Sequence, residues 1–352
     1  MLATLWFCLV ALMITMYVIL DGFDLGVGAT YLFTGRNAGE RRALLAAIGP
    51  VWDGNEVWLL AAAGTLYFAF PRLYAVALSG FYLPLIMVLW LLMGRGIAIE
   101  LRGHVDDPLW RSAWDVIFNV SSALLALFFG VALGNVVRGV PMTDSGFFFS
   151  PLWTDFRLGE ERGVIDWYTL LTGVAALLAL SMHGSLWAVL KTRDELNARA
   201  ARIAARLWWP VVAITVLLSL VTFAVQPKIG ESFAARPWGV VFPLIAIAAL
   251  AGVRWYATGG REQHAFLASC TYLLGMLTST VFGLYPWVLP AGPDTSRSLT
   301  VTDIATSDYG LWVALLWWLP GMILVTAYFI YTYRSFAGKV APTDPTEASH
   351  YG

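Results

Sequence analysis

Residues 5–33 read LWFCLVALMITMYVILDGFDLGVGATYLF, and this stretch decides the fold. It contains no lysine or arginine, and it is longer than the roughly 20 apolar residues that a membrane-spanning helix needs. Its only charged side chains are Asp21 and Asp24. The stretch therefore predicts a transmembrane helix that carries two carboxylates inside the membrane.

The rest of the chain repeats this apolar pattern from end to end. Of its 352 residues, 59% are hydrophobic and 13% are charged, whereas about a quarter of the residues of a soluble domain are charged. We expect an all-α integral membrane protein with nine transmembrane helices. They lie at about 5–33, 50–69, 73–99, 110–138, 165–190, 207–226, 238–257, 265–289 and 308–332.

The lengths of the connections predict how these helices group. A basic connection runs from Lys191 to Arg206 and divides the spans into two groups. Residues at about 1–190 form the first bundle with its following span, and residues at about 207–333 form the remaining spans. We expect two four-helix bundles and a peripheral ninth helix. Residues 1–340 then form one polytopic membrane domain, and residues 341–352 form a disordered tail.

Basic residues predict the orientation, because cytoplasmic connections are enriched in lysine and arginine. Of the 22 basic residues, 15 fall on the connections of one side, Arg95 among them, and seven fall on the other side. This bias places the N-terminus outside and the C-terminus in the cytoplasm. The net charge of −1 provides no basic surface for nucleic acid. Cys8 and Cys270 lie in apolar runs, so we expect neither a disulfide framework nor a metal site.

Acidic side chains recur inside the apolar spans, where a charge is costly unless it is paired or functional. In the first span and at the start of the second, two pairs of acids are each spaced three residues apart, which puts both carboxylates on one helix face. By the topology above, six carboxylates fall on the inner half of the first four spans: Asp21, Asp24, Asp53, Glu56, Glu100 and Asp115. Such a series is typical of a proton relay from the cytoplasm toward mid-membrane.

Structural roles are the alternatives for these residues. Asp21, Asp24 and Asp53 could each pair with a buried arginine or with backbone donors. Pro50 suits a first helical turn, so Asp53 and Glu56 would face the positive end of a helix dipole. For the other residues, Glu100 beside Arg102 could be a membrane-edge anchor, Asp115 a surface ion pair with Arg111, Trp52 a membrane anchor, and Gly22 with Gly26 a close helix contact.

A haem protein of this architecture would need axial ligands on its spans, and His183 is the one histidine inside a span. No second histidine is available to face it. His183 is therefore expected to be an interfacial polar residue in preference to a haem ligand. The sequence also contains no nucleotide-binding or zinc motif.

Several motifs, taken together, resemble subunit II of the cytochrome bd-type quinol oxidases. They are DGFDLGVG at 21–28, GRN at 35–37 with ERR at 40–42, GPVWDGNEVWL at 49–59, SGFY at 79–82 and GNVVRGVP at 134–141. The run with Trp-Asp-Gly-Asn is highly specific for that family. The resemblance is clear from residue 15 to about 141 and continues more loosely to the end of the chain.

The resemblance implies a subunit of an oxidoreductase in the bacterial plasma membrane. The family oxidises quinol, reduces dioxygen to water and generates a proton gradient without pumping. Haems b and d are held by the partner, subunit I, so this chain has no haem ligand, no metal site and no catalytic residue of its own. A structural quinone in this subunit and small single-span accessory subunits are left open.

The family also implies roles for particular residues. Trp52 and Asp53 match the Trp-Asp pair of a proton path toward the haems, and Asp21 and Glu100 match acidic positions on that path. Val51 stands where some members have histidine, so any role of that histidine is absent or moved. An independent proton-coupled transporter and a pure scaffolding subunit are the alternatives. The transporter is disfavoured because these buried acids lie only in the first half of the chain.

Overall fold

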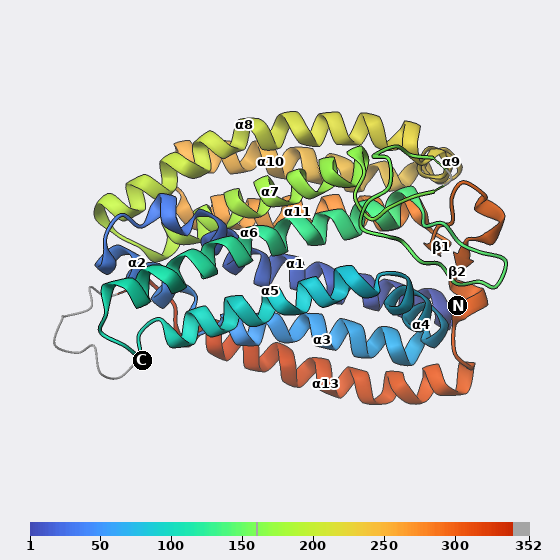
Figure 1. The fold of residues 1–352 in the computed structure, drawn as a ribbon, viewed down its shortest axis with the longest axis horizontal. Coiled ribbons are helices and arrows are strands. Elements are labelled where there is room, and N and C mark those ends of the chain that lie inside the picture. Colours follow the sequence, from blue (N-terminus) through green and yellow to red (C-terminus); the bar gives the residue numbers. More distant parts are fainter. Residues whose placement is uncertain (160, 341–352) are drawn as a thin grey trace.

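The computed structural model describes residues 1–159 and 161–340, and these residues are predominantly helical. The tail at 341–352, expected to be disordered, lies outside the described residues. The longer helices are α1 (Leu2–Thr34), α3 (Trp52–Ala69), α5 (Tyr82–Leu101), α6 (Pro108–Arg138), α7 (Trp167–Lys191), α8 (Asp194–Val225), α10 (Val241–Thr258), α11 (Glu262–Leu284) and α13 (Asp308–Ser335). They run side by side along one direction (Figure 1).

Short elements connect the long helices at their ends. They are α2 (Ala38–Ile48), α4 (Pro71–Gly80), α9 (Pro227–Ala235), α12 (Val301–Ile304) and the 3₁₀ helices η1 (Pro237–Val240) and η2 (Thr295–Arg297). The strands β1 (Trp287–Leu289) and β2 (Leu299–Thr300) form an antiparallel pair. Figure 1 shows this pair at the end of the molecule where α1 begins, and α13 ends at the opposite end.

Eight helices of the described chain are long and apolar enough to cross a membrane. They are α1, α5, α6, α7, α8, α10 with η1, α11 and α13. The second expected span, 50–69, corresponds to α3, which is not among the eight. Its first two turns carry Asp53, Asn55 and Glu56, and these polar side chains reduce the apolar character of an 18-residue helix.

Helix α1 lies at the centre of the bundle and packs against α3, α6, α7, α11 and α13. Every residue from Asp21 to Tyr31 is buried. A Cβ atom on Gly26 would lie 1.8 Å from the carbonyl oxygen of Leu180, so the backbones of α1 and α7 are in contact. The close helix contact predicted for Gly22 and Gly26 is therefore confirmed, since both glycines face α7.

Helix α13 lies along the outer edge of the bundle (Figure 1), and in this fully described helix Leu311 is the only buried side chain. Its two ends are nevertheless attached to the rest of the chain. Near its start, Trp6 Nε1 donates to the carbonyl oxygen of Leu311 at 3.1 Å. After its end, the Val340 N–H donates to the Lys191 carbonyl oxygen at 2.8 Å, and Lys339 Nζ lies 2.8 Å from a carboxylate oxygen of Glu262.

The third expected span, 73–99, is wrong as a single helix, because the chain forms α4 and α5 with a break at Phe81. Pro84 explains the break. It has no N–H to donate to the carbonyl oxygen of Gly80 four residues earlier. That oxygen instead accepts a hydrogen bond from Ser150 N at 3.2 Å.

Other boundaries also differ from the expectation. Helix α8 begins at Asp194, so most of the basic connection is the first part of a long helix. Helix α11 ends at Leu284, because Pro286 disfavours helical geometry at the preceding residue. Pro50 precedes α3, which begins at Trp52, so Glu56 lies beyond the first turn.

Candidate functional site

A buried ion pair joins the middle of α1 to α5. The side chains of Asp21 and Arg95 are both fully buried, and they form two parallel hydrogen bonds. One of these bonds joins Arg95 Nη1 to Asp21 Oδ2 at 2.8 Å. Arg95 therefore lies in the bundle interior, and its assignment to a cytoplasmic connection was wrong. The buried arginine partner considered as the structural alternative for Asp21 is present.

Helix α3 adds two more side chains to this pair. Glu56 Oε2 lies 3.5 Å from Arg95 Nη2, and the Glu56 side chain is 24% exposed. The Arg95 guanidinium lies 5.9 Å from the centre of the Trp52 ring. A planar guanidinium can bind a carboxylate with two donors and also contact an aromatic ring, which lysine cannot do equally well. Arg95 of α5 thus gathers residues from α1 and α3.

Asp24 lies one helical turn after Asp21 and has a different partner. Its Oδ2 accepts a hydrogen bond from Asn55 Nδ2 at 2.8 Å, and both side chains are buried. The hydroxyl group of Tyr333 on α13 donates a hydrogen bond to Asn55 Oδ1 at 2.9 Å. Asp24 Oδ1 has no hydrogen-bond partner among the described residues. The described residues therefore provide a hydrogen bond to one of the two carboxylate oxygens of Asp24.

The charges in this cluster do not balance. Asp21, Asp24 and Glu56 provide three carboxylates, and Arg95 provides one guanidinium. Burial in a medium of low dielectric disfavours uncompensated charge. The arrangement is chemically suited to take up a proton, because a protonated carboxyl group reduces the excess negative charge.

The other two acids of the expected path lie on the surface of the chain. Asp53 on α3 and Glu100 on α5 are both exposed. The two helices meet where the Trp52 ring lies 3.5 Å from the position that a Cβ on Gly96 would take. The structure therefore gathers Trp52, Glu56, Asp21 and Asp24 around Arg95 but leaves the Asp53 and Glu100 side chains outside this cluster.

The prediction that Asp115 forms a surface ion pair with Arg111 was wrong. Asp115 is buried and forms ion pairs with Arg102 and with Arg41, the latter at 2.9 Å. It also accepts a hydrogen bond from the Tyr31 hydroxyl at 2.9 Å. Arg111 pairs instead with Asp106 in the preceding loop. Asp115 thus ties α1, the chain after α5, and α2 to α6, which is a structural role.

His183 is fully buried among α1, α7 and α11. Its Nδ1 lies 2.7 Å from Ser269 Oγ, and its Nε2 lies 2.9 Å from the Ile19 carbonyl oxygen. Its ring stacks on Phe266 at 4.9 Å between centroids. Because both ring nitrogens have protein partners, His183 does not fit the role of an axial haem ligand.

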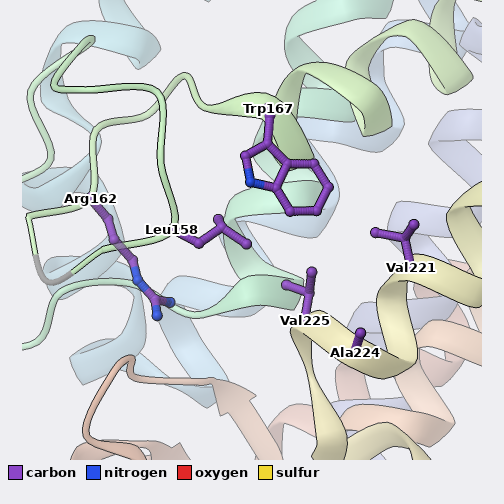
Figure 2. A pocket seen from close by; sticks show the side chains of 6 residues that line it. All are labelled: Leu158, Arg162, Trp167, Val221, Ala224 and Val225. Atoms are coloured by element: carbon purple, nitrogen blue, oxygen red, sulfur yellow. The ribbon is translucent and has the colours of Figure 1, made fainter.

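A separate cavity of about 470 Å³ lies where α7 begins and α8 ends. Figure 2 shows Arg162, Leu158 and Trp167 on one side of it and three small aliphatic residues of α8 on the other. Arg162 Nη1 donates to the Arg138 carbonyl oxygen at 2.7 Å, and burial lowers the pKa of its guanidinium. The cavity is at the opposite end of the bundle from Trp52, where α3 begins, so it is a second and independent site.

Three residues of the buried cluster had no place in the site predicted from the sequence. Arg95 interrupts an apolar run, and its position inside the expected span 73–99 is the signal that could have identified it as intramembrane. Asn55 belongs to the Trp-Asp-Gly-Asn motif, and its depth in α3 is implied by the three-residue spacing from Trp52. Tyr333 gave no signal, because its contact with Asn55 spans most of the chain.

Long apolar helices around a buried cluster of carboxylates define a multi-pass membrane protein. Residues 2–336 match the family model described as cytochrome bd terminal oxidase subunit II. The chain belongs to this family, and it is a multi-pass protein of the bacterial inner membrane.

Known proteins support this assignment along the full length of the chain. A cytochrome bd ubiquinol oxidase subunit 2 from Bacillus subtilis is 31% identical over 343 residues, covering 97% of each chain. A probable cytochrome oxidase subunit 2 from Haemophilus influenzae is 30% identical, covering 96% of this chain and 94% of that protein. The bd oxidase structure from Geobacillus thermodenitrificans has the same fold, with a TM-score of 0.74 at 15% identity, covering 95% of this chain and 98% of that chain.

Proposed function

We propose that this chain supports a haem-bearing subunit I and supplies part of a cytoplasmic proton path to it. The complex would oxidise quinol, reduce dioxygen to water and generate a proton gradient without pumping. The observation that carries the proposal is the cluster of three carboxylates around the single guanidinium of Arg95, buried among the long helices. An excess of carboxylates inside a membrane is the arrangement that proton transfer needs.

The order of residues along α3 and α5 supports a route into this cluster. Asp53 and Glu100 are exposed near the end where α3 begins and α5 ends. From there the Trp52 ring lies beside Arg95, and Glu56 and Asp21 are its two carboxylate partners. Protons would enter at the exposed acids and reach Asp21 and Asp24. Asp21 then serves both as an ion-pair partner and as a proton site.

The exposed acids also support a partner on this face. The same two helices also expose large apolar side chains, including Leu60, Trp90 and Met93. A carboxylate exposed to lipid would be costly, so a protein partner with polar groups is the more favourable cover. We assign this face to subunit I, which would hold haems b and d and the quinol site. Small accessory subunits remain part of the proposal as further partners.

We also propose α3 as the ninth membrane span. Its 18 residues extend about 27 Å, close to the thickness of the hydrocarbon core. The contacts of α1 with α3 and α6 and of α10 with α11 support two four-helix bundles, with α13 as the peripheral helix, within one polytopic domain. In this arrangement the N-terminus lies outside and the C-terminus in the cytoplasm.

The cavity of Figure 2 is the place we propose for a structural quinone. Its walls from Leu158, Val221, Ala224 and Val225 are apolar, which suits an isoprenoid tail, and Arg162 provides N–H donors for a quinone carbonyl oxygen. The residues that line the cavity therefore fit the chemistry of a quinone. The quinone would be structural, because the cavity is at the other end of the bundle from the carboxylate cluster.

The experiment that tests the proton path is quinol-driven oxygen consumption by the co-purified complex carrying Asp53→Asn. Haem spectra are recorded from the same sample. A matched control is Asp106→Asn, which removes a carboxylate from an exposed loop beyond α5. We expect intact haem spectra with a large loss of turnover for Asp53→Asn and no loss for the control.

The other outcomes have definite meanings. Loss of haem together with activity would make Asp53 a structural residue of the subunit interface. Unchanged turnover with intact haems would remove Asp53 from the proton path and favour a purely scaffolding subunit.

A further inference from the structure

The amide of Asn55 is held in one orientation by three neighbours. Its Nδ2 lies 2.8 Å from Asp24 Oδ2 and 3.3 Å from the carbonyl oxygen of Leu20. A carbonyl oxygen can only accept a hydrogen bond, so the NH₂ group of Asn55 must face α1. The amide oxygen then faces the Tyr333 hydroxyl, which donates to it at 2.9 Å.

Tyr333 reaches this position from the outermost helix. Its ring lines a cavity of about 250 Å³ bounded by the chain between α2 and α3, the end of α7, and residues 335–340. The ring packs near Trp187, with 6.2 Å between centroids. The ring thus borders a space between the last residues of the described chain and the bundle, while the hydroxyl points to the buried amide.

We propose that Asn55 and Tyr333 are positioning residues that set how tightly Asp24 holds a proton. Tyr333 fixes the Asn55 amide so that its N–H donates to the Asp24 carboxylate. This inference rests on the proton path proposed above and adds two residues to it. Asn55 does not carry the proton itself, since an amide donates a hydrogen bond without releasing its proton.

The direction of the effect follows from hydrogen-bond chemistry. An N–H donor favours the ionised carboxylate, whereas an amide oxygen in the same place accepts a hydrogen bond only from a protonated carboxyl group. Without the Tyr333 hydroxyl, only the Leu20 carbonyl oxygen at 3.3 Å still orients the amide, so Asn55 turns more readily and can offer its oxygen to Asp24. Protonated Asp24 is then favoured over its carboxylate.

Other titratable groups near Asp24 are kept unchanged in the test. They are Asp21 on α1, Glu56 on α3 and Arg95 on α5. Further titratable side chains of α1 and of the helices that pack against it are Tyr17 on α1, Asp115 on α6, His183 on α7 and Cys270 on α11. Because none of them is altered in a Tyr333 variant, a change in the behaviour of Asp24 reports on the Tyr333 and Asn55 pair.

The experiment uses the complex with subunit I carrying Tyr333→Phe, which removes one oxygen atom and keeps the ring. Infrared spectra across a pH titration follow the carbonyl stretch of protonated Asp24, assigned as the band that Asp24→Asn removes. We expect the band to persist to higher pH by about one pH unit, which corresponds to about 1.4 kcal/mol. The pH profile of oxygen consumption shifts in the same direction. Tyr331→Phe on the same helix, whose residue is 72% exposed, is the matched control and leaves both unchanged.

A double-mutant cycle tests whether Tyr333 acts through Asn55. In an Asn55→Leu background, Tyr333→Phe causes no further shift if the amide is the intermediary. An Asp24 band at the wild-type position in Tyr333→Phe would overturn the inference, as would an equal shift in both backgrounds. A different result would remove Asp24 from the proton path. In that case no band at any pH depends on Asp24, and Asp24→Asn leaves turnover unchanged.

Discussion

Replacing Arg95 by leucine removes the only positive charge described in the buried cluster. The variant leaves Asp21 fully buried without its two hydrogen bonds, and Glu56 loses a cation 3.5 Å away. Removing one partner of a buried ion pair costs about 3–5 kcal/mol. Because total stabilities are commonly about 5–15 kcal/mol, this loss is a large fraction of the stability of the subunit.

Two further variants separate charge from geometry. Arg95→Lys keeps the positive charge but cannot donate two parallel hydrogen bonds to Asp21, so we expect an intermediate loss. Arg95→Leu combined with Asp21→Asn removes both charges of the pair, and we expect it to regain a large part of the stability lost by Arg95→Leu.

The assay is the yield of haem-containing complex and its midpoint of thermal unfolding in detergent, measured for all variants in parallel. The expected order is wild type, then Arg95→Lys and the double variant, then Arg95→Leu. Assembly of Arg95→Leu at the wild-type yield and midpoint would refute the reasoning. A double variant no more stable than Arg95→Leu would show that the ion pair is not the source of the loss.

Three other perturbations have definite outcomes. Gly26→Ala places a Cβ atom 1.8 Å from the Leu180 carbonyl oxygen, so α1 and α7 must separate and the yield of folded complex drops sharply, as measured by size-exclusion chromatography. Hydrogen bonds from Arg199 hold the pKa of Glu40 below its usual value, so this carboxylate stabilises the fold at neutral pH and loses that effect as the pH falls through the lowered pKa. We therefore expect Glu40→Gln to lower the free energy of unfolding by about 2 kcal/mol at pH 7, with a smaller difference at pH 4 in thermal unfolding; an equal difference at both values would contradict this. Ala224→Phe places a phenyl ring in the cavity of Figure 2 and reduces its volume, and extraction followed by chromatography is expected to find less bound quinone with unchanged haem.

Apolar runs in the sequence predicted most of the helices, because the cost of exposing a backbone to lipid leaves few alternatives to a helix. The predicted boundaries were wrong where a proline decided them: Pro84 cannot donate to the Gly80 carbonyl oxygen, and Pro286 disfavours helical geometry at the residue before it. The buried acids Asp21 and Asp24 were also predicted, since their depth follows from their position in one apolar run.

The partners of these acids could not be predicted in the same way. Arg95 and Tyr333 meet α1 and α3 only through tertiary packing, which a single sequence does not encode locally. Asp115 shows the same limit, because the local spacing favoured Arg111 while the fold supplies Arg102 and Arg41. Helix positions were therefore accessible from hydropathy, whereas charge pairing depended on contacts between distant segments.

Two hydrogen bonds between α13 and the N-terminal part of the chain can form only late in synthesis. The bond between Trp6 and the Leu311 carbonyl oxygen joins residues 305 positions apart, and the Tyr333 bond to Asn55 joins residues 278 apart. During synthesis, α1 and α3 are made long before these partners exist. Trp6 and Asn55 therefore have no partner on α13 until the ribosome has made almost the whole chain, and a nascent chain stopped before residue 311 forms neither of these two hydrogen bonds.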